Sequence, residues 1–174
     1  MLSDCRAYRG FIDRVQIHEI SVILHVGVNN PNDSIDIRDS FDSRVISFHS
    51  DNWSGIKETY LDMKLQPQQN IRFVPLDISE TDLDSWWNEN ESVDINMVLL
   101  GIDGSEKNRL VLNGMTKLLE KVEYVISTVG VDSSEYQALN KILKEHRFEG
   151  AELESYDSRY NICLFKKSKK IQID

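Results

Sequence analysis

The stretch that decides the fold is GAELESYDSRYNICLFKK, residues 150–167, close to the end of the sequence. Two strand-like segments, 150–156 and 160–166, flank a short loop that contains Asp157 and Ser158. Two such segments joined by a short polar loop predict a β-hairpin, whose strands run antiparallel. The sheet is therefore expected to end in antiparallel strands, whatever the direction of the strands before it.

Five apolar segments precede this hairpin and predict a different kind of strand. Their valine, isoleucine and leucine residues are nearly continuous and do not alternate with polar residues, which is typical of parallel strands buried on both faces. The five segments are SVILHVGV (21–28), RVISFHS (44–50), IRFVPLDI (71–78), INMVLLGID (95–103) and EYVISTVG (123–130).

Helical apolar spacing lies between the strands, over residues 54–65, 82–88, 106–122 and 133–148, and a leading helix is expected within residues 1–20. Right-handed crossovers between parallel strands place such helices on both faces of the sheet. We therefore predict an α/β, three-layer, Rossmann-like fold. It has about seven strands, mostly parallel, with a C-terminal antiparallel hairpin.

The length of 174 residues favours one domain, predicted over residues 21–167, after the leading helix of residues 1–20 and before a basic tail, 168–174. Cys5 and Cys163 are the only cysteines and have no CxxC spacing, so we expect free thiols and a cytoplasmic protein. Cys163 falls in the middle of a strand and is expected to be buried and inert.

Charge and hydropathy argue against two classes of partner, nucleic acids and membranes. The net charge is −9, which argues against a nucleic-acid partner, because that would need clustered positive charge. The sequence has no apolar run of the ~18 residues that a membrane span needs and no apolar signal segment, so no membrane association is expected.

Ligands of open α/β sheets bind outside the carboxyl ends of the strands, so polar residues there are the first candidates for a site. The first strand ends near His25, Gly27 and Asn29, and the second at His49 and Asp51. The third ends at Asp77 and the fourth at Asp103.

Each candidate also has a structural interpretation. Gly27 and Asn29 suit a tight turn, and His49 suits a partly exposed strand end. Asp77 could cap a helix, and Asp103 could belong to a turn before Gly104. His25, His49, Asp77 and Asp103 could alternatively hold a divalent metal, although no short ligand spacing favours this. The tandem Trp86–Trp87 is expected to serve packing.

Five strand–helix units followed by a hairpin describe the class I methyltransferase architecture, and one motif is more specific. The segment LLGIDGSEKNRLVLNGMTKLL, residues 99–119, is similar to the strand-four motif LKIDVEGAE…LEVLKGA of the FkbM-type methyltransferases. It keeps Ile102–Asp103, Leu112, Gly114 and Leu118–Leu119. Three further segments are similar to the family's TLDSLL, DVGANxG and AFEP motifs: Leu83–Ser85, His25–Pro31 and Ser47–Ser50. Over residues 21–167 the chain thus resembles this family.

The departures from the family pattern are concentrated at polar positions. His25 stands where the family has aspartate, Pro31 where it has glycine, and His49 where it has the ribose-binding glutamate. Ser105 and Asn108 replace two further glutamates. The packing residues are kept while the polar ones change, which favours a retained scaffold with an altered site.

The resemblance implies S-adenosylmethionine as cofactor and O-methylation of a sugar or another small molecule. By the same resemblance, Asp103 is the catalytic candidate, and the cofactor-binding candidates are His25, Gly27, Asn29, His49, Asp51 and Asp77. The alternative is a catalytically inactive methyltransferase-fold protein that works as a binding or scaffold module through a protein partner.

Overall fold

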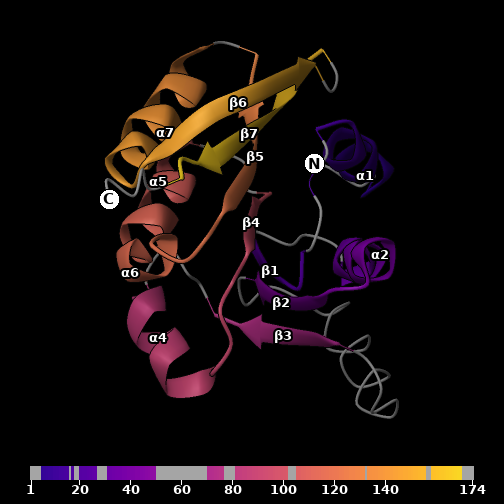
Figure 1. Cartoon of the computed structure of the whole chain (residues 1–174), viewed down its shortest axis with the longest axis vertical. Coiled ribbons are helices and arrows are strands. Elements are labelled where there is room, and N and C mark those ends of the chain that lie inside the picture. Colours follow the sequence, from indigo (N-terminus) through magenta and orange to yellow (C-terminus); the bar gives the residue numbers. More distant parts are fainter. Residues whose placement is uncertain are drawn as a thin grey trace.

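The computed structural model describes residues 5–15, 17, 20–26, 31–49, 70–76, 81–101, 105–131, 133–155 and 158–169. Within these residues, helices and strands alternate along most of the chain (Figure 1). The strands are β1 Val22–Val26, β2 Arg44–His49, β3 Ile71–Pro75, β4 Met97–Leu100, β5 Tyr124–Gly130, β6 Phe148–Ser155 and β7 Tyr160–Lys167. The helices are α1 Cys5–Arg14, α2 Pro31–Phe41, α4 Leu83–Asn90, α5 Ser105–Asn113, α6 Thr116–Leu119 and α7 Ser133–Glu145.

The strands form one seven-stranded sheet in the order β3-β2-β1-β4-β5-β7-β6. The strands from β1 to β5 run parallel to one another. Strand β7 lies between β5 and β6 and runs antiparallel to both, and its pairing with β6 is the predicted hairpin. The predicted fold class is confirmed, including the antiparallel C-terminal hairpin.

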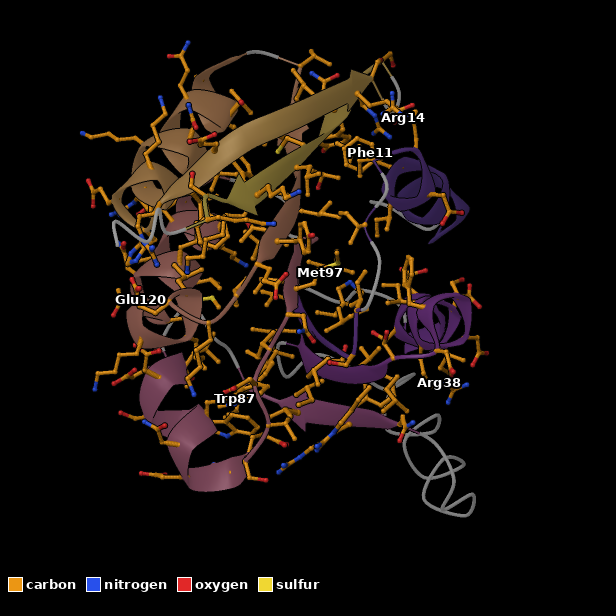
Figure 2. All side chains as sticks on the ribbon, viewed as in Figure 1. Phe11, Arg14, Arg38, Trp87, Met97 and Glu120 are labelled. Carbon is orange, nitrogen blue, oxygen red and sulfur yellow. The ribbon has the colours of Figure 1, made fainter. Side chains whose placement is uncertain are left out.

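Helices cover both faces of the sheet. Helices α1 and α2 lie on one face, and α4, α5, α6 and α7 lie on the other (Figure 1). We call these two sides of the sheet the α1/α2 face and the α4–α7 face. Each face has its own apolar cluster. The α1/α2 face contains Phe11, Ile23 and Met97, and the α4–α7 face contains Leu24, Phe48 and Trp87. Figure 2 shows Phe11 between α1 and the hairpin, and Trp87 between α4 and the sheet.

The continuous apolar segments form the central strands because both of their faces are covered. Every residue of β1 and of β4 is buried. Burying one large aliphatic side chain contributes roughly 1.5–3 kcal/mol, so these two strands alone supply much of the core energy. Trp87 is 4% exposed and Trp86 packs against the same cluster, which confirms the expected packing role of the tandem tryptophans.

The helix predicted over residues 106–122 is instead two helices, α5 and α6, and Asp84 of α4 explains the break. The Asp84 carboxylate accepts hydrogen bonds from the backbone N–H groups of Lys117 and Leu118, both at 2.8 Å, and from the Thr116 hydroxyl at 3.2 Å. It thereby satisfies the free N–H groups at the start of α6. In addition, the Asp84 N–H donates to the Gly114 carbonyl at 3.1 Å.

Gly114 lies at that break because there is no room for a side chain. A Cβ atom at this position would lie 2.9 Å from the Thr81 carbonyl oxygen, closer than such atoms normally approach. The contact between α4 and the α5–α6 junction therefore needs glycine here. Leu83–Ser85 and Gly114, two matches to the FkbM-type motifs, thus meet in the fold as packing residues.

The bounds of helix α2 were not predicted from the sequence. Ile37 is its only fully buried aliphatic residue among the described side chains, and Asp33 and Ser34 are buried beside it. A helix whose inward side is partly polar gives a weak apolar periodicity. The helix predicted over residues 54–65 lies outside the described residues.

Candidate functional site

The sheet has one topological switch point, between β1 and β4. Chain order runs outward from β1 to β2 and β3 on one side, and from β4 to β5 on the other. The carboxyl ends of β1 and β4 are neighbours, with Val26 paired to Leu100. Open α/β sheets bind their ligands at such a point, so this edge is the candidate site.

Most of the predicted site residues lie outside the described residues, namely Gly27, Asn29, Asp51, Asp77 and Asp103. In the sequence they come shortly after β1, β2, β3 and β4. His49 is the last residue of β2 and pairs with Pro75 of β3, but its side chain lies outside the described part. His25 is the predicted site residue whose side chain the structure does describe.

His25 is buried within a short polar chain. It is 5% exposed, and its Nδ1 lies 2.8 Å from the Ser34 hydroxyl of α2. The Ser34 hydroxyl lies 2.7 Å from the Ser47 hydroxyl of β2, and both serines are fully buried. His25 also pairs with Ser47 in the sheet register. A contact between His25 and a cofactor stays a prediction. The Nδ1 atom of His25 is engaged with Ser34.

Two titratable groups close to this edge have pKa values that burial shifts in opposite directions. Burial lowers the pKa of His25 to about 4, so the imidazole is neutral at physiological pH. Burial, and secondarily the nearby Asp36 carboxylate, raise the pKa of Asp33 to about 6. Asp33 lies in the first turn of α2 and is 9% exposed.

The helices that follow β4 and β5 also begin with acidic residues. Glu106, in the first turn of α5, pairs with Arg109 at 2.5 Å, and the hydrogen bond from Arg109 lowers the pKa of this carboxyl. Glu135 of α7 accepts a hydrogen bond of 2.6 Å from the N–H of Gly130, the last residue of β5. The edge therefore carries carboxylates next to several strand ends.

Asn108 of α5, at a position where the FkbM-type motif has glutamate, is 2% exposed, and its Oδ1 has no hydrogen-bond partner among the described residues. Cys163 is buried, as predicted, and burial raises the pKa of its thiol to about 12, so that the thiolate is disfavoured. Among the described side chains, no group of three or more His, Cys, Asp or Glu residues is placed to hold a metal. No helix in the described part is long and apolar enough to cross a membrane.

The sequence matches no protein-family model and no curated protein. Solved structures, in contrast, share the architecture. The structure of TrmK from M. capricolum, in complex with S-adenosyl-homocysteine, matches with a TM-score of 0.62 at 14% identity, over 93% of this chain and 68% of that one. A candidate RNA methyltransferase from Pyrococcus horikoshii matches with a TM-score of 0.66 at 12% identity, over 95% and 82% of the two chains.

A third match is precorrin-6y methyltransferase from Geobacter metallireducens, with a TM-score of 0.59 at 15% identity, over 94% of this chain and 87% of that one. The fold is that of the class I methyltransferases. Identities this low establish the fold alone, and none of these three neighbours is an FkbM-type enzyme by its description.

Sequence reasoning missed the residues that surround His25. Ser34 and Ser47 are isolated polar residues in the sequence, with no motif to single them out. Strand β2 offered one signal, because the polar residue Ser47 lies between the buried apolar residues Ile46 and Phe48. A small hydroxyl in the middle of a buried strand requires a hydrogen-bond partner, and a neighbouring polar residue on β1 could have been sought.

Proposed function

We propose that this protein is an S-adenosylmethionine-dependent methyltransferase whose cofactor binds at the carboxyl ends of β1 and β4. The observation that carries the proposal is the strand order, with its switch point between β1 and β4 and its inserted antiparallel strand β7. The fold neighbour TrmK supports the choice of cofactor, since it was solved with S-adenosyl-homocysteine.

The cofactor-binding roles follow the order of the strands. Gly27 and Asn29 would approach the methionine part from the turn after β1, since glycine allows the backbone to come close to a ligand. His49 and Asp51, after β2, would take the ribose hydroxyls, and Asp77, after β3, the adenine amine. His25, near the end of β1, is the remaining cofactor-binding candidate.

Asp103, after β4, is the proposed catalytic residue. Methyl transfer requires the acceptor oxygen to lie in line with the sulfonium methyl group, so most of the catalysis comes from proximity and orientation. A carboxylate beside the acceptor hydroxyl would orient it and take up its proton as the new O–CH₃ bond forms. This role rests on the similarity of residues 99–119 to the FkbM-type motif.

The proposed acceptor is a sugar or another small molecule in the cytoplasm. The net charge of −9 and the carboxylates Asp33, Glu106 and Glu135 favour a neutral or cationic acceptor over a polyanion. The fold neighbours include a candidate RNA methyltransferase as well as a precorrin methyltransferase, so RNA is the second acceptor class to be tested.

One observation favours a second function, that of a catalytically inactive scaffold that binds a protein partner. The position of the family's first-motif aspartate is taken by His25, which is neutral, buried and bonded to Ser34. If the polar groups of the site have been converted to such packing roles, the fold would persist without cofactor chemistry.

Calorimetric titration with S-adenosylmethionine and S-adenosylhomocysteine tests the proposal. We expect micromolar affinity, about −8 kcal/mol, that weakens at least tenfold, by about 1.4 kcal/mol, on Gly27→Val or Asp103→Ala. Gly10→Ala in α1 is the matched control, because a Cβ there meets nothing within 4 Å. Absence of binding up to about 1 mM, weaker than roughly −4 kcal/mol, would reject the enzyme and favour the scaffold.

A further inference from the structure

Three buried polar side chains connect three elements on the α1/α2 face of the sheet. His25 is on β1, Ser34 on α2 and Ser47 on β2, with 2.8 Å from the His25 Nδ1 to the Ser34 Oγ and 2.7 Å between the two hydroxyl oxygens. The three residues are 5%, 0% and 0% exposed. Their apolar neighbours on the same strands include Ile23 and Val45 of the same face.

The hydroxyl of Ser34 is the centre of this chain. It has one proton and two partners, so it donates to one of them and accepts from the other. The chain can therefore run from His25 to Ser47 or in reverse, and in both directions a neutral imidazole completes it. Each member depends on the next, since a buried polar group without a partner costs roughly 1–3 kcal/mol.

The chain lies across the connection from β1 to α2. Strand β1 ends at Val26 and α2 begins at Pro31, so only residues 27–30 separate the two elements. His25 comes just before Val26, the last residue of β1, and Ser34 is in the first turn of α2. Ser47 ties both to β2, next to His25 in the register. The chain thus holds the end of β1 and the start of α2 at a fixed distance from each other.

We infer that His25, Ser34 and Ser47 are positioning residues, which hold the end of β1, the first turn of α2 and β2 in the arrangement that the ligand at the carboxyl edge requires. The inference rests on the proposed function for its ligand and on the two hydrogen bonds for its geometry. Fully paired buried hydrogen bonds add little net stability compared with apolar packing, so their effect is to fix one arrangement.

The test compares variants that break the chain with variants that keep it. Ser34→Ala removes the central hydroxyl, and His25→Leu removes its partner. His25→Asn keeps an amide at the place of Nδ1 and should restore the bond. Ser127→Ala is the matched control, because Ser127 is also fully buried, and its hydroxyl donates to the Thr128 carbonyl at 3.1 Å on β5.

The first readout is amide hydrogen exchange of peptides that cover residues 23–36, measured without ligand. We expect Ser34→Ala and His25→Leu to raise exchange there by roughly tenfold, as loss of about 1.4 kcal/mol of local stability predicts. His25→Asn should stay within about twofold of the wild type, and Ser127→Ala should leave this segment unchanged. If Ser34→Ala fails to fold, Ser47→Ala breaks the second bond alone and takes its place.

The second readout is the dissociation constant of S-adenosylhomocysteine, expected to rise roughly tenfold in the same two variants and not in Ser127→Ala. Equal exchange in Ser34→Ala and Ser127→Ala would overturn the inference. Raised exchange with unchanged affinity would overturn it too. If the wild-type protein binds no S-adenosylhomocysteine, the proposed function fails. The exchange comparison still decides whether the three polar residues hold β1, α2 and β2 in one arrangement.

Discussion

The two faces of the sheet use buried polar groups in different ways. On the α4–α7 face, Asp84 is 8% exposed and serves the backbone of α6 as a helix cap. On the α1/α2 face, His25, Ser34 and Ser47 bond side chain to side chain across three elements. The first arrangement is needed to form the fold, whereas the second adjoins the edge where a ligand is proposed to bind.

The largest expected effect is on the α4–α7 face. Asp84→Ala leaves two backbone N–H groups of α6 without a charged acceptor, and we expect a loss of about 3 kcal/mol in the free energy of unfolding. Chemical denaturation measures it. The control is Asp94→Ala, whose side chain is 71% exposed and pairs with Lys121, and which should change stability by less than about 0.5 kcal/mol. A loss as small as that of the control would contradict the claim that Asp84 is needed to form the fold.

The next effect is on the α1/α2 face and depends on pH. The folded pKa of His25 is lowered to about 4, so the unfolded chain binds more protons between pH 4 and 6.5, and this group makes stability rise with pH over that window. The pKa of Asp33 is raised to about 6, so this group makes stability fall as pH rises from about 4 to 6. The two contributions oppose each other in the wild-type protein.

Single variants should separate them. His25→Asn leaves Asp33, so stability should fall by roughly 2 kcal/mol as pH rises from 4 to 6 relative to the wild type. Asp33→Asn leaves His25, so stability should rise over the same window and be higher than that of the wild type at pH 7. Thermal unfolding at several pH values measures both. Parallel pH profiles for the two variants would contradict the assignment.

A third test compares one glycine from each face. Gly114→Ala places a Cβ 2.9 Å from the Thr81 carbonyl oxygen and should destabilise the protein by about 1–2 kcal/mol. Gly10→Ala, within α1, meets no atom within 4 Å and should stabilise it by about 0.5–1 kcal/mol through helix propensity. The difference in the urea midpoint between the two variants is the measurement, and a shift of the same sign in both would contradict it.

The sequence predicted the strands well and the helices less well, for reasons that particular residues show. Strands such as β1 and β4 are buried on both faces, so their apolar residues are continuous. The break at Gly114 depends on Asp84, which is 30 residues earlier in the sequence, and α2 buries Asp33 and Ser34 where apolar residues would have marked it. Such contacts exist only once the elements are packed.

The candidate site was harder to predict than the fold. His25 was identified from its place at a strand end, but its partners Ser34 and Ser47 come together only through the register of β1 with β2 and the return of α2. Periodicity predicts which side of a strand is buried. It does not predict that the Ser34 hydroxyl bonds to the imidazole of His25 and the Ser47 hydroxyl to that of Ser34.

The smallest expected effect concerns how α1 is attached to the hairpin. Arg14 pairs with Glu154 of β6 at 2.7 Å, and both side chains are more than two-fifths exposed, at 49% and 41%. A double-mutant cycle with Arg14→Ala and Glu154→Ala should give a coupling below about 1 kcal/mol that shrinks further in high salt. A larger, salt-insensitive coupling would show that the ion pair, and not Phe11 and Ile12, holds α1 on the sheet.

The central claim is that a ligand binds at the carboxyl edge between β1 and β4. Amide hydrogen exchange with and without S-adenosylhomocysteine tests it most directly. We predict protection in peptides that cover residues 23–36 and 98–108, and none in the hairpin peptides over residues 148–167. Protection confined to the hairpin, or no protection at ligand concentrations near 1 mM, would contradict the account.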